Sequence, residues 1–314
     1  MKFSSSIKSI TNIYKRMSNF GKILLFIALI LILIVFFKSL NLDIQREGYS
    51  TNDQFLFKTG NDVYDEFYSS IYDYLVFNRT KTEFEVGKII NSTDPTDVSV
   101  ILDVGSGTGH TVDELSRRNL KNVMGIDISP SMVSEAKANY PLLNFAVGNA
   151  LDESQFKHQT FTHILCLYFT IYYFKDKRKF FDNCMDWLMP GGYLIIHLVD
   201  REKFDPILPP GNPLYIVSPQ KYAKERITKT KITFNDFVYN SKFNFDKNNN
   251  IATFEEKFKF NDGKVRKQDQ VLYMEDTEEI LTIAQQCGFI LQGKIDMVKC
   301  AYEHQYLYIF TKPS

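Results

Sequence analysis

The chain has few of the residues that build metal centres and disulfide frameworks. Its 314 residues include four cysteines, five histidines and one tryptophan. No two cysteines have the C-x-x-C spacing, and no two histidines form an H-x-x-x-H pair. We therefore expect free thiols and no metal site, and chemistry that uses other side chains.

The chain also lacks an excess of positive charge. Lys and Arg together number 37, as do Asp and Glu, and the first 38 residues hold six basic residues and no acid. The rest of the chain is therefore mildly acidic, with 31 basic and 37 acidic residues. A protein that binds nucleic acid needs a basic surface against the phosphates, so we do not expect such a partner.

The acid-free N-terminal stretch contains a run of 15 apolar residues, 23–37, bracketed by Lys22 and Lys38. We interpret residues 1–22 as a basic tail and residues 23–40 as a single transmembrane helix in contact with a lipid bilayer, whose lysines reach the interface. A cleaved signal peptide is the alternative, although no small-x-small site follows the run. The basic leader predicts a cytosolic N-terminus.

Residues 41–61 are polar and read as a linker to one large domain, residues 62–314. The composition is 44% apolar and 15% aromatic, which is ample for a globular core. Within residues 62–78, aromatic and aliphatic residues recur every three or four positions, which predicts an amphipathic helix carrying Tyr64 and Tyr72.

A glycine-rich string, ILDVGSGTGH at residues 101–110, follows an apolar run that reads as a buried strand and precedes a helix-compatible stretch. In such a strand-to-helix turn, Gly105 can adopt positive φ and Gly107 lets a ligand approach the backbone. Gly109 lets the helix pack closely on the sheet. The free N–H groups at the helix start then face a ligand.

Two acids define that ligand. Asp103 stands two residues before the first glycine, where it would repel a pyrophosphate but accept a hydrogen bond from an ammonium group. Asp127 ends the next apolar strand, where its carboxylate can accept hydrogen bonds from both hydroxyls of a ribose. The spacing is G-x-G-x-G, not the G-x-G-x-x-G of nicotinamide sites. An ammonium group and a ribose together describe S-adenosyl-L-methionine.

With these motifs the chain resembles the class I S-adenosylmethionine-dependent methyltransferases from about residue 62 onward. The resemblance implies that residues 148–150 contact adenine, with Asn149 where many members carry Asp, and that the helix of residues 62–78 lies over the cofactor. The expected cofactor contacts are Tyr64, Tyr72, Asp103, Gly105, Ser106, Gly107, Gly109, Asp127, Ile128, Asn149, Ala150 and Leu167.

The resemblance also implies an α/β, Rossmann-like sheet of seven strands, with strands at residues 160–167 and 189–197. Residues 200–275 depart from a minimal member. Period-two alternation of apolar residues predicts antiparallel strands with one buried face, carrying Phe243 and Phe245, Phe258 and Phe260, and Val271 and Tyr273. We expect this insertion to cap a substrate.

Methyl transfer by in-line displacement requires little beyond positioning, because the sulfonium methyl is already activated. His197, Asp200 and Arg201 follow the fifth strand and are candidates for catalysis. The expected acceptor is a small molecule or a protein, since the chain lacks the Asn- or Asp-Pro-Pro-Tyr and Pro-Cys strings of nucleic-acid methyltransferases. An inactive cofactor-binding membrane adaptor and an NAD-type oxidoreductase are the alternatives. The sequence does not decide on which side of the membrane the domain lies. The basic leader places the domain outside the cytosol, whereas the cofactor is made in the cytosol.

Overall fold

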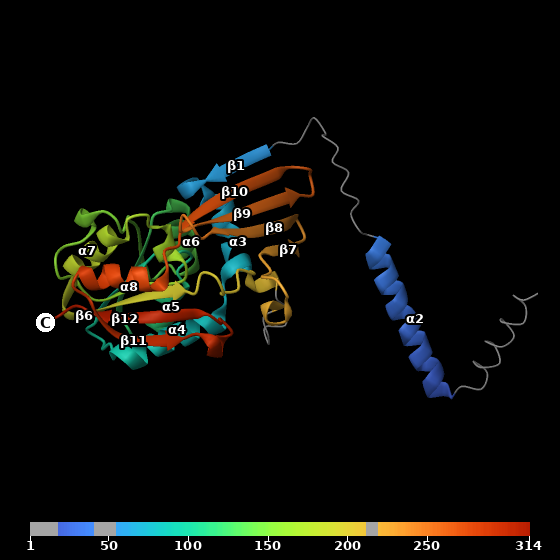
Figure 1. Ribbon diagram of the computed structural model, residues 1–314, viewed down its shortest axis with the longest axis horizontal. Helices are drawn as coiled ribbons and strands as arrows, with labels where there is room; N and C mark the ends of the chain where they lie inside the picture. The colour runs from blue at the N-terminus through green and yellow to red at the C-terminus, as the bar shows by residue number, and fades with distance from the viewer. Residues whose placement is uncertain (1–17, 41–54, 212–218) are drawn as a thin grey trace, which may run out of the picture. The chain divides into compact units, whose positions relative to one another are not determined.

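The computed structural model describes residues 18–40, 55–211 and 219–314. The chain divides into two units, Met1–Thr51 and Asn52–Ser314. The first contains helix α2, Asn19–Leu40, and the second contains every other helix and strand that is described (Figure 1).

The predicted transmembrane helix is not supported. Among the residues whose placement is described, no helix combines the length and apolar character needed to cross a bilayer. The predicted bilayer contact and the single-pass location with a cytosolic N-terminus therefore have no support in the structure. Residues 1–17 of the predicted tail lie outside the described residues.

The second unit is built on a seven-stranded sheet with the order β11-β12-β6-β5-β2-β3-β4. Five strands are parallel, and β12 is antiparallel to both of its neighbours. The strands are β2 Val100–Val104, β3 Asn122–Asp127, β4 Asn144–Val147, β5 Phe161–Cys166, β6 Leu188–Val199, β11 Ile290–Asp296 and β12 Gln305–Thr311. This arrangement matches the predicted seven-stranded α/β sheet.

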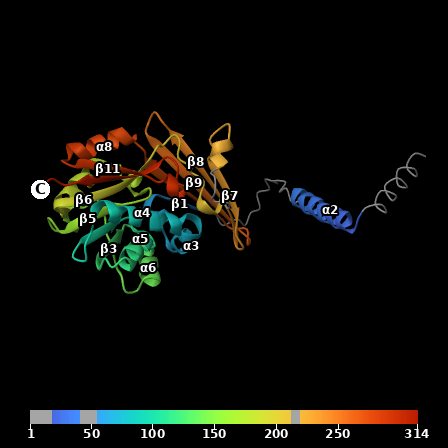
Figure 2. The same ribbon diagram turned by 90° about the horizontal axis from the view of Figure 1, so that it is seen from below.

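Helices cover both faces of this sheet (Figure 2). Helices α4 and α5 pack together, as do α7 and α8, and Figure 2 shows α4, α5 and α6 on the side of the sheet opposite α8. The helices are α4 Arg79–Thr93, α5 His110–Arg117, α6 Pro130–Asn139, α7 Lys177–Trp187 and α8 Thr277–Gln286.

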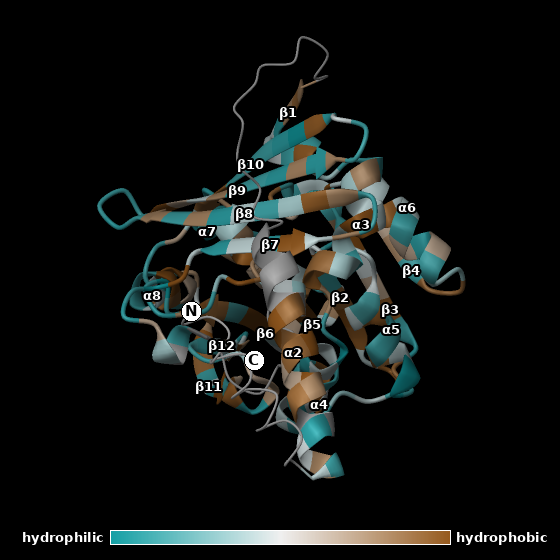
Figure 3. Cartoon of the chain, turned by 90° about the vertical axis from the view of Figure 1, so that its right-hand side faces the viewer, coloured by the Kyte–Doolittle hydropathy of each residue, from teal (hydrophilic) through white to brown (hydrophobic). Residues whose placement is uncertain are grey.

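The parallel strands are mostly apolar because both of their faces are buried. Leu102, Ile164 and Ile196 belong to one hydrophobic cluster, whereas their neighbours Ile101 and Leu165 belong to another. Strands β5 and β6 are accordingly largely brown in Figure 3. The sheet thus separates two cores, and the acidic residues Asp103 and Asp127 lie near the carboxyl ends of β2 and β3.

A second, five-stranded sheet has the order β1-β10-β9-β8-β7. Four of its strands come from residues 200–275 and are antiparallel, as predicted. The strands are β1 Phe55–Thr59, β7 Lys229–Thr233, β8 Phe237–Asp246, β9 Ile251–Phe260 and β10 Val265–Tyr273.

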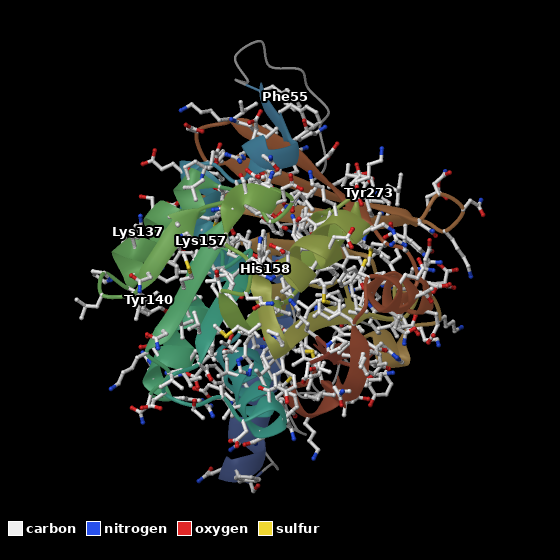
Figure 4. All side chains as sticks on the ribbon, turned by 90° about the vertical axis from the view of Figure 1, so that its left-hand side faces the viewer. Phe55, Lys137, Tyr140, Lys157, His158 and Tyr273 are labelled. Carbon is white, nitrogen blue, oxygen red and sulfur yellow. The ribbon has the colours of Figure 1, made fainter. Side chains whose placement is uncertain are left out.

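The predicted linker is wrong over its last residues, because Phe55–Thr59 forms edge strand β1, paired in parallel with β10. Its partner lies about two hundred residues away, which local sequence patterns cannot reveal. Phe55 is 58% exposed, and Figure 4 shows it at the outer edge of the molecule, away from Tyr140 beside the main sheet. The rest of the predicted linker, up to residue 54, lies outside the described residues.

The buried face of β10 is the opposite of the predicted one. Val271 is 42% exposed, whereas Leu272 is 4% exposed. Arg266, Gln268 and Gln270 alternate with exposed or half-buried residues and lie on the buried face with Leu272. Alternation gives the period of a strand but not which phase faces inward, and here polar side chains take the inner face because they bond to one another.

Helix α3, Glu66–Val76, is shorter than the predicted helix of residues 62–78. It begins after Asp65, whose side chain accepts a hydrogen bond from the Tyr68 N–H. Phe67 packs edge-on against Phe258 and Phe260 of the second sheet. Helix α3 therefore lies between the second sheet and the carboxyl ends of the strands of the main sheet.

Candidate functional site

The glycine-rich turn lies between β2 and α5, where the predicted ligand site was placed. Gly105, Gly107 and Gly109 have φ values of 70°, 53° and 94°, a region that L side chains rarely adopt. The N–H groups of Gly105 and Ser106 donate to the Ile126 carbonyl at 2.8 and 2.9 Å. These bonds hold the turn against the end of β3.

The three glycines meet different surroundings. A Cβ on Gly105 would lie 2.5 Å from Thr170, and one on Gly109 would lie 2.7 Å from the Phe145 ring. A Cβ on Gly107 would meet only the Tyr72 ring, at 3.8 Å. Gly105 and Gly109 are thus required for packing, whereas Gly107 borders open space, as expected where a ligand approaches the backbone.

Asp127 lies beside this open space. Its Oδ2 accepts a hydrogen bond from the Gly107 N–H at 3.0 Å, and its Oδ1 accepts one from the Ser129 N–H at 2.9 Å. Burial raises the pKa of Asp127, and the backbone N–H groups of Ser129, Gly107 and Ile128 oppose that rise. An ionised carboxylate has about four acceptor positions. These donors do not fill all of them, so the carboxylate can still accept a hydrogen bond from the ribose expected there.

Asp103 is buried beneath the turn, with 3% of its surface exposed. Burial, together with the nearby Glu85 and Asp127, raises its pKa to about 8, and Lys81 opposes this rise. An arriving cation would reverse this balance, because a positive neighbour favours the ionised carboxylate. The environment of Asp103 therefore suits an ammonium group.

Two cavities meet at the turn. The larger, of about 810 Å³, extends from the turn to the inner face of the second sheet, within the size range of small-molecule sites. Eight of the predicted cofactor residues line it: Tyr64, Tyr72, Gly105, Gly107, Asp127, Ile128, Asn149 and Ala150. The smaller cavity, of about 100 Å³, is lined by Asp103, Ser106 and Leu167.

The adenine-contact prediction needs one refinement. The Asn149 Oδ1 already accepts the Leu151 N–H at 2.9 Å, so this side chain offers a ligand mainly its amide N–H groups. Ile128 is 44% exposed and lines the same cavity, which gives a flat ring an apolar surface. Gly109 lines neither cavity and acts through packing.

The three predicted catalytic candidates lie elsewhere, and none lines either of the two cavities described. His197 is fully buried, its Nδ1 contacts the Tyr168 carbonyl, and burial lowers its pKa to about 3, which keeps the ring neutral. Arg201 donates to the Asn250 side chain at 2.7 Å and to the Met274 carbonyl. Asp200 pairs with Lys203 at 3.1 Å. Their contacts indicate structural roles.

The residues that complete the larger cavity were missed from the sequence. Tyr68, Tyr173 and Gln270 line it together with Tyr64 and Tyr72. The repeated glutamines of β10 were a possible signal, but only the fold shows that they face inward.

A polar cluster fastens α3 to the turn. Asp73 accepts the Thr108 hydroxyl at 2.6 Å and contacts His110 Nε2 at 2.7 Å. His110 Nδ1 lies 2.7 Å from the Tyr140 hydroxyl, and the His110 ring stacks on Phe77 at 3.6 Å. At the other end of the helix, Asp65 accepts two bonds from the Arg266 guanidinium at 2.8 Å. Helix α3 is therefore held at both ends.

Comparison with known proteins agrees with this geometry. Residues 102–196 match a family described as a methyltransferase domain. A demethylmenaquinone methyltransferase from Chlorobaculum parvum is 32% identical over 103 residues, which are 32% of this chain and 42% of the relative. One from Chlorobaculum tepidum is 31% identical over the same shares. The chain thus spans less than half the length of these curated relatives.

Solved structures show the same fold over most of the chain. The CcbJ methyltransferase from Streptomyces caelestis matches with a TM-score of 0.60 and 14% identity, covering 81% of this chain and all of that one. An amino pentose methyltransferase from Micromonospora echinaspora, solved with S-adenosylmethionine bound, matches with a TM-score of 0.53 and 17% identity, covering 79% and 97%. The predicted α/β methyltransferase fold is confirmed, and the comparisons support S-adenosylmethionine as the cofactor.

Proposed function

We propose that this chain is an S-adenosylmethionine-dependent methyltransferase that acts on a small molecule. The observation that carries this proposal is the single cavity of about 810 Å³, which Gly107 and Asp127 line at one end and Gln270 at the other. The first end offers the groups that a nucleoside requires. The second leaves room for an acceptor beside it, beneath the second sheet.

The residues of the site divide the work of binding. Asp127 would hold the ribose hydroxyls, Asp103 the ammonium group, and Ile128 and Asn149 the adenine. When bound, the cofactor supplies a methyl group carried on a positively charged sulfur. The contribution of this chain is to hold an acceptor atom in line with that methyl and to keep water away, and such positioning accounts for much of catalysis in reactions of this kind.

The names of the relatives do not transfer directly. The curated relatives are named for demethylmenaquinone and one structural neighbour for an amino pentose, but the family match ends at residue 196. Strands β7 to β10, which cover the acceptor end, come after that residue. The acceptor is therefore to be inferred from the residues of this chain.

The two alternatives are less well supported. An NAD-type oxidoreductase would bring a pyrophosphate to the turn, beside the carboxylates of Asp103 and Asp127. An inactive adaptor would not need a second, tyrosine-lined end to the cavity. An adaptor would bind the cofactor but methylate no acceptor, so an assay of methyl transfer distinguishes it from an enzyme.

The test has two stages. Calorimetry should show binding of S-adenosylmethionine and of its demethylated product, and none of NAD. Transfer of labelled methyl into small molecules of a cell extract should then follow. Binding of NAD in place of S-adenosylmethionine would contradict the proposal, and cofactor binding without transfer to any acceptor would favour the adaptor.

A further inference from the structure

A buried carboxylate underlies the acceptor end of the cavity. Glu256 of β9 is 2% exposed. Its Oε1 accepts the hydroxyls of Tyr68 at 3.0 Å and Tyr239 at 2.6 Å. Its Oε2 accepts the amide N–H groups of Gln268 at 2.7 Å and Gln270 at 2.6 Å. Four donors occupy the four acceptor positions of an ionised carboxylate.

The charge of Glu256 has no direct counter-ion in the part of the chain that the structure describes. Arg266 is the basic residue of the same network, but its guanidinium pairs with Asp65 and reaches Glu256 only through Gln268. A buried anion with neutral donors around it produces a negative potential that low dielectric strengthens. Burying such a group stabilises a fold poorly, so its place beside a cavity indicates a role in binding.

Glu256 also fixes the direction of the hydrogen bonds at the cavity wall. Because a carboxylate accepts, the group that Gln270 turns toward it is the NH2, and the Gln270 Oε1 faces the tyrosines. That oxygen accepts the Tyr64 hydroxyl at 2.8 Å and the Tyr173 hydroxyl. Each hydroxyl has one proton, which is used within the network. Tyr64 and Tyr173 therefore offer the cavity lone pairs and not donors.

The tyrosine rings extend this preference. Tyr64 lies edge to face with Tyr68, Tyr72 and Tyr173, at centroid distances of 5.6, 6.4 and 6.1 Å. Aromatic faces carry negative potential and attract cations. All four tyrosines line the cavity. This end of the cavity thus combines tyrosine rings, hydroxyl lone pairs and a buried negative charge.

The basic residues of the wall are already engaged in contacts. Arg226 donates to the carbonyls of Arg201 at 2.9 Å and Phe204 at 2.6 Å, and its guanidinium packs on the Phe204 and Phe243 rings. Lys203 pairs with Asp200. The wall is therefore poorly suited to an acidic acceptor such as a carboxylate or phosphate.

We propose that the methyl acceptor is an amine, whose N–H groups donate to the oxygens of Tyr64 and Tyr173. This inference rests on the proposed methyltransferase function and names the acceptor atom. The amine binds as an ammonium ion and loses a proton to solvent before the transfer, which leaves a neutral amine in the site. Its nitrogen lone pair forms the new C–N bond as the C–S bond breaks, and the electron pair of that bond stays on sulfur. The methylated ammonium then releases a proton to water.

A nitrogen acceptor fits this wall better than a hydroxyl. A neutral amine is nucleophilic without a general base, whereas an alcohol must lose its proton as it reacts. The tyrosines are unsuited to remove that proton, because burial raises the pKa values of Tyr64 and Tyr173. The positive charge that develops on nitrogen is stabilised by Glu256 and the rings.

The test uses full-length protein saturated with S-adenosylhomocysteine and three probes that share one ring: benzylamine, benzyl alcohol and benzoate. Calorimetry should show benzylamine binding about tenfold or more tightly than benzyl alcohol, from the buried charge and ring contacts, and benzoate binding most weakly. With S-adenosylmethionine, labelled methyl should appear on the nitrogen of benzylamine.

Variants then assign the preference to the network. Glu256→Gln removes the buried charge but endangers folding, so Tyr64→Phe with Tyr173→Phe serves as the second variant, which keeps both rings. Either should reduce the preference for benzylamine over benzyl alcohol about tenfold. Tyr273→Phe, on strand β10 with Gln270 but outside the cavity lining, should leave the preference unchanged.

Each result decides the question. If benzyl alcohol or benzoate binds as tightly as benzylamine, or if no probe binds while S-adenosylhomocysteine does, the amine inference is wrong and the proposed function survives. Failure to bind S-adenosylhomocysteine would instead overturn the proposed function, and the inference with it.

Discussion

The two ends of the large cavity are assembled from sequence in different ways. At the cofactor end, the bond that joins Gly107 to Asp127 spans 20 residues, so both partners belong to consecutive strand and turn motifs. At the acceptor end, the bond from Tyr64 to Gln270 spans 206 residues. A local motif therefore encodes one end, and only the closed fold encodes the other.

This difference explains what relatives share. The family match covers residues 102–196, which hold the turn and Asp127. The tyrosines of α3 and the polar face of β10 lie outside it. Of the four tyrosines at the acceptor end, Tyr173 alone lies within the family match. Substitutions at the two ends should therefore have separable effects.

The largest effect is expected for Gly107→Val, which should abolish cofactor binding. A branched side chain is strained at φ 53° and fills the open space beside Tyr72. Gly191→Val is the matched control, because Gly191 has φ 73° and its Cβ would meet only Ser314, also at 3.8 Å. Calorimetry that shows normal binding by a folded Gly107→Val protein would contradict the placement of the turn.

Leu272→Ala should lower the free energy of unfolding by about 2–4 kcal/mol, the usual range for emptying a buried leucine site. Val271→Ala, its exposed neighbour, should change it by about 0.5 kcal/mol or less. Urea denaturation measures both. Equal effects would show that the inner face of β10 is wrongly assigned, and with it the wall at the acceptor end.

Asp127→Ala should weaken binding of S-adenosylmethionine by about 1–3 kcal/mol, the range for hydrogen bonds to a charged group. Asp152→Ala is a suitable control, since Asp152 also accepts a backbone N–H but lies outside the lining of the large cavity. Unchanged calorimetric affinity in a folded Asp127→Ala protein would remove Asp127 from the site.

A further effect concerns Asp103 and the pH dependence of stability. The pKa of Asp103 is raised from an ordinary value of 3.8 to about 8, so between these values the folded protein binds more protons than the unfolded chain. Stability of the ligand-free protein should therefore fall as pH rises from about 4 to about 8. Asp103→Asn should flatten this slope, whereas Asp97→Asn, at an exposed position, should preserve it. Thermal unfolding of the wild-type protein and of Asp103→Asn at pH 5 and pH 8 measures this dependence. The same fall in stability in both proteins would show that Asp103 is not responsible.

These results show which parts of the molecule local patterns can predict. The sequence predicts the turn at Gly105, Gly107 and Gly109 because the conformation of the turn depends on residues a few positions apart. It does not predict strand β1, because the partner strand is distant. It predicts an inward Val271, because alternation does not fix which phase faces the core. It makes His197 a candidate for catalysis from its place after a strand, although burial leaves this residue no access to either cavity.

The anchoring of α3 has a consequence for how molecules reach the site. Asp65 holds the start of the helix to Arg266, and Asp73 holds its end to His110, so we expect α3 to stay in place when molecules bind. Molecules would then enter and leave at another side of the large cavity, where residues 202–209 form the wall. We expect the rates at which molecules enter and leave to depend on that segment and not on α3.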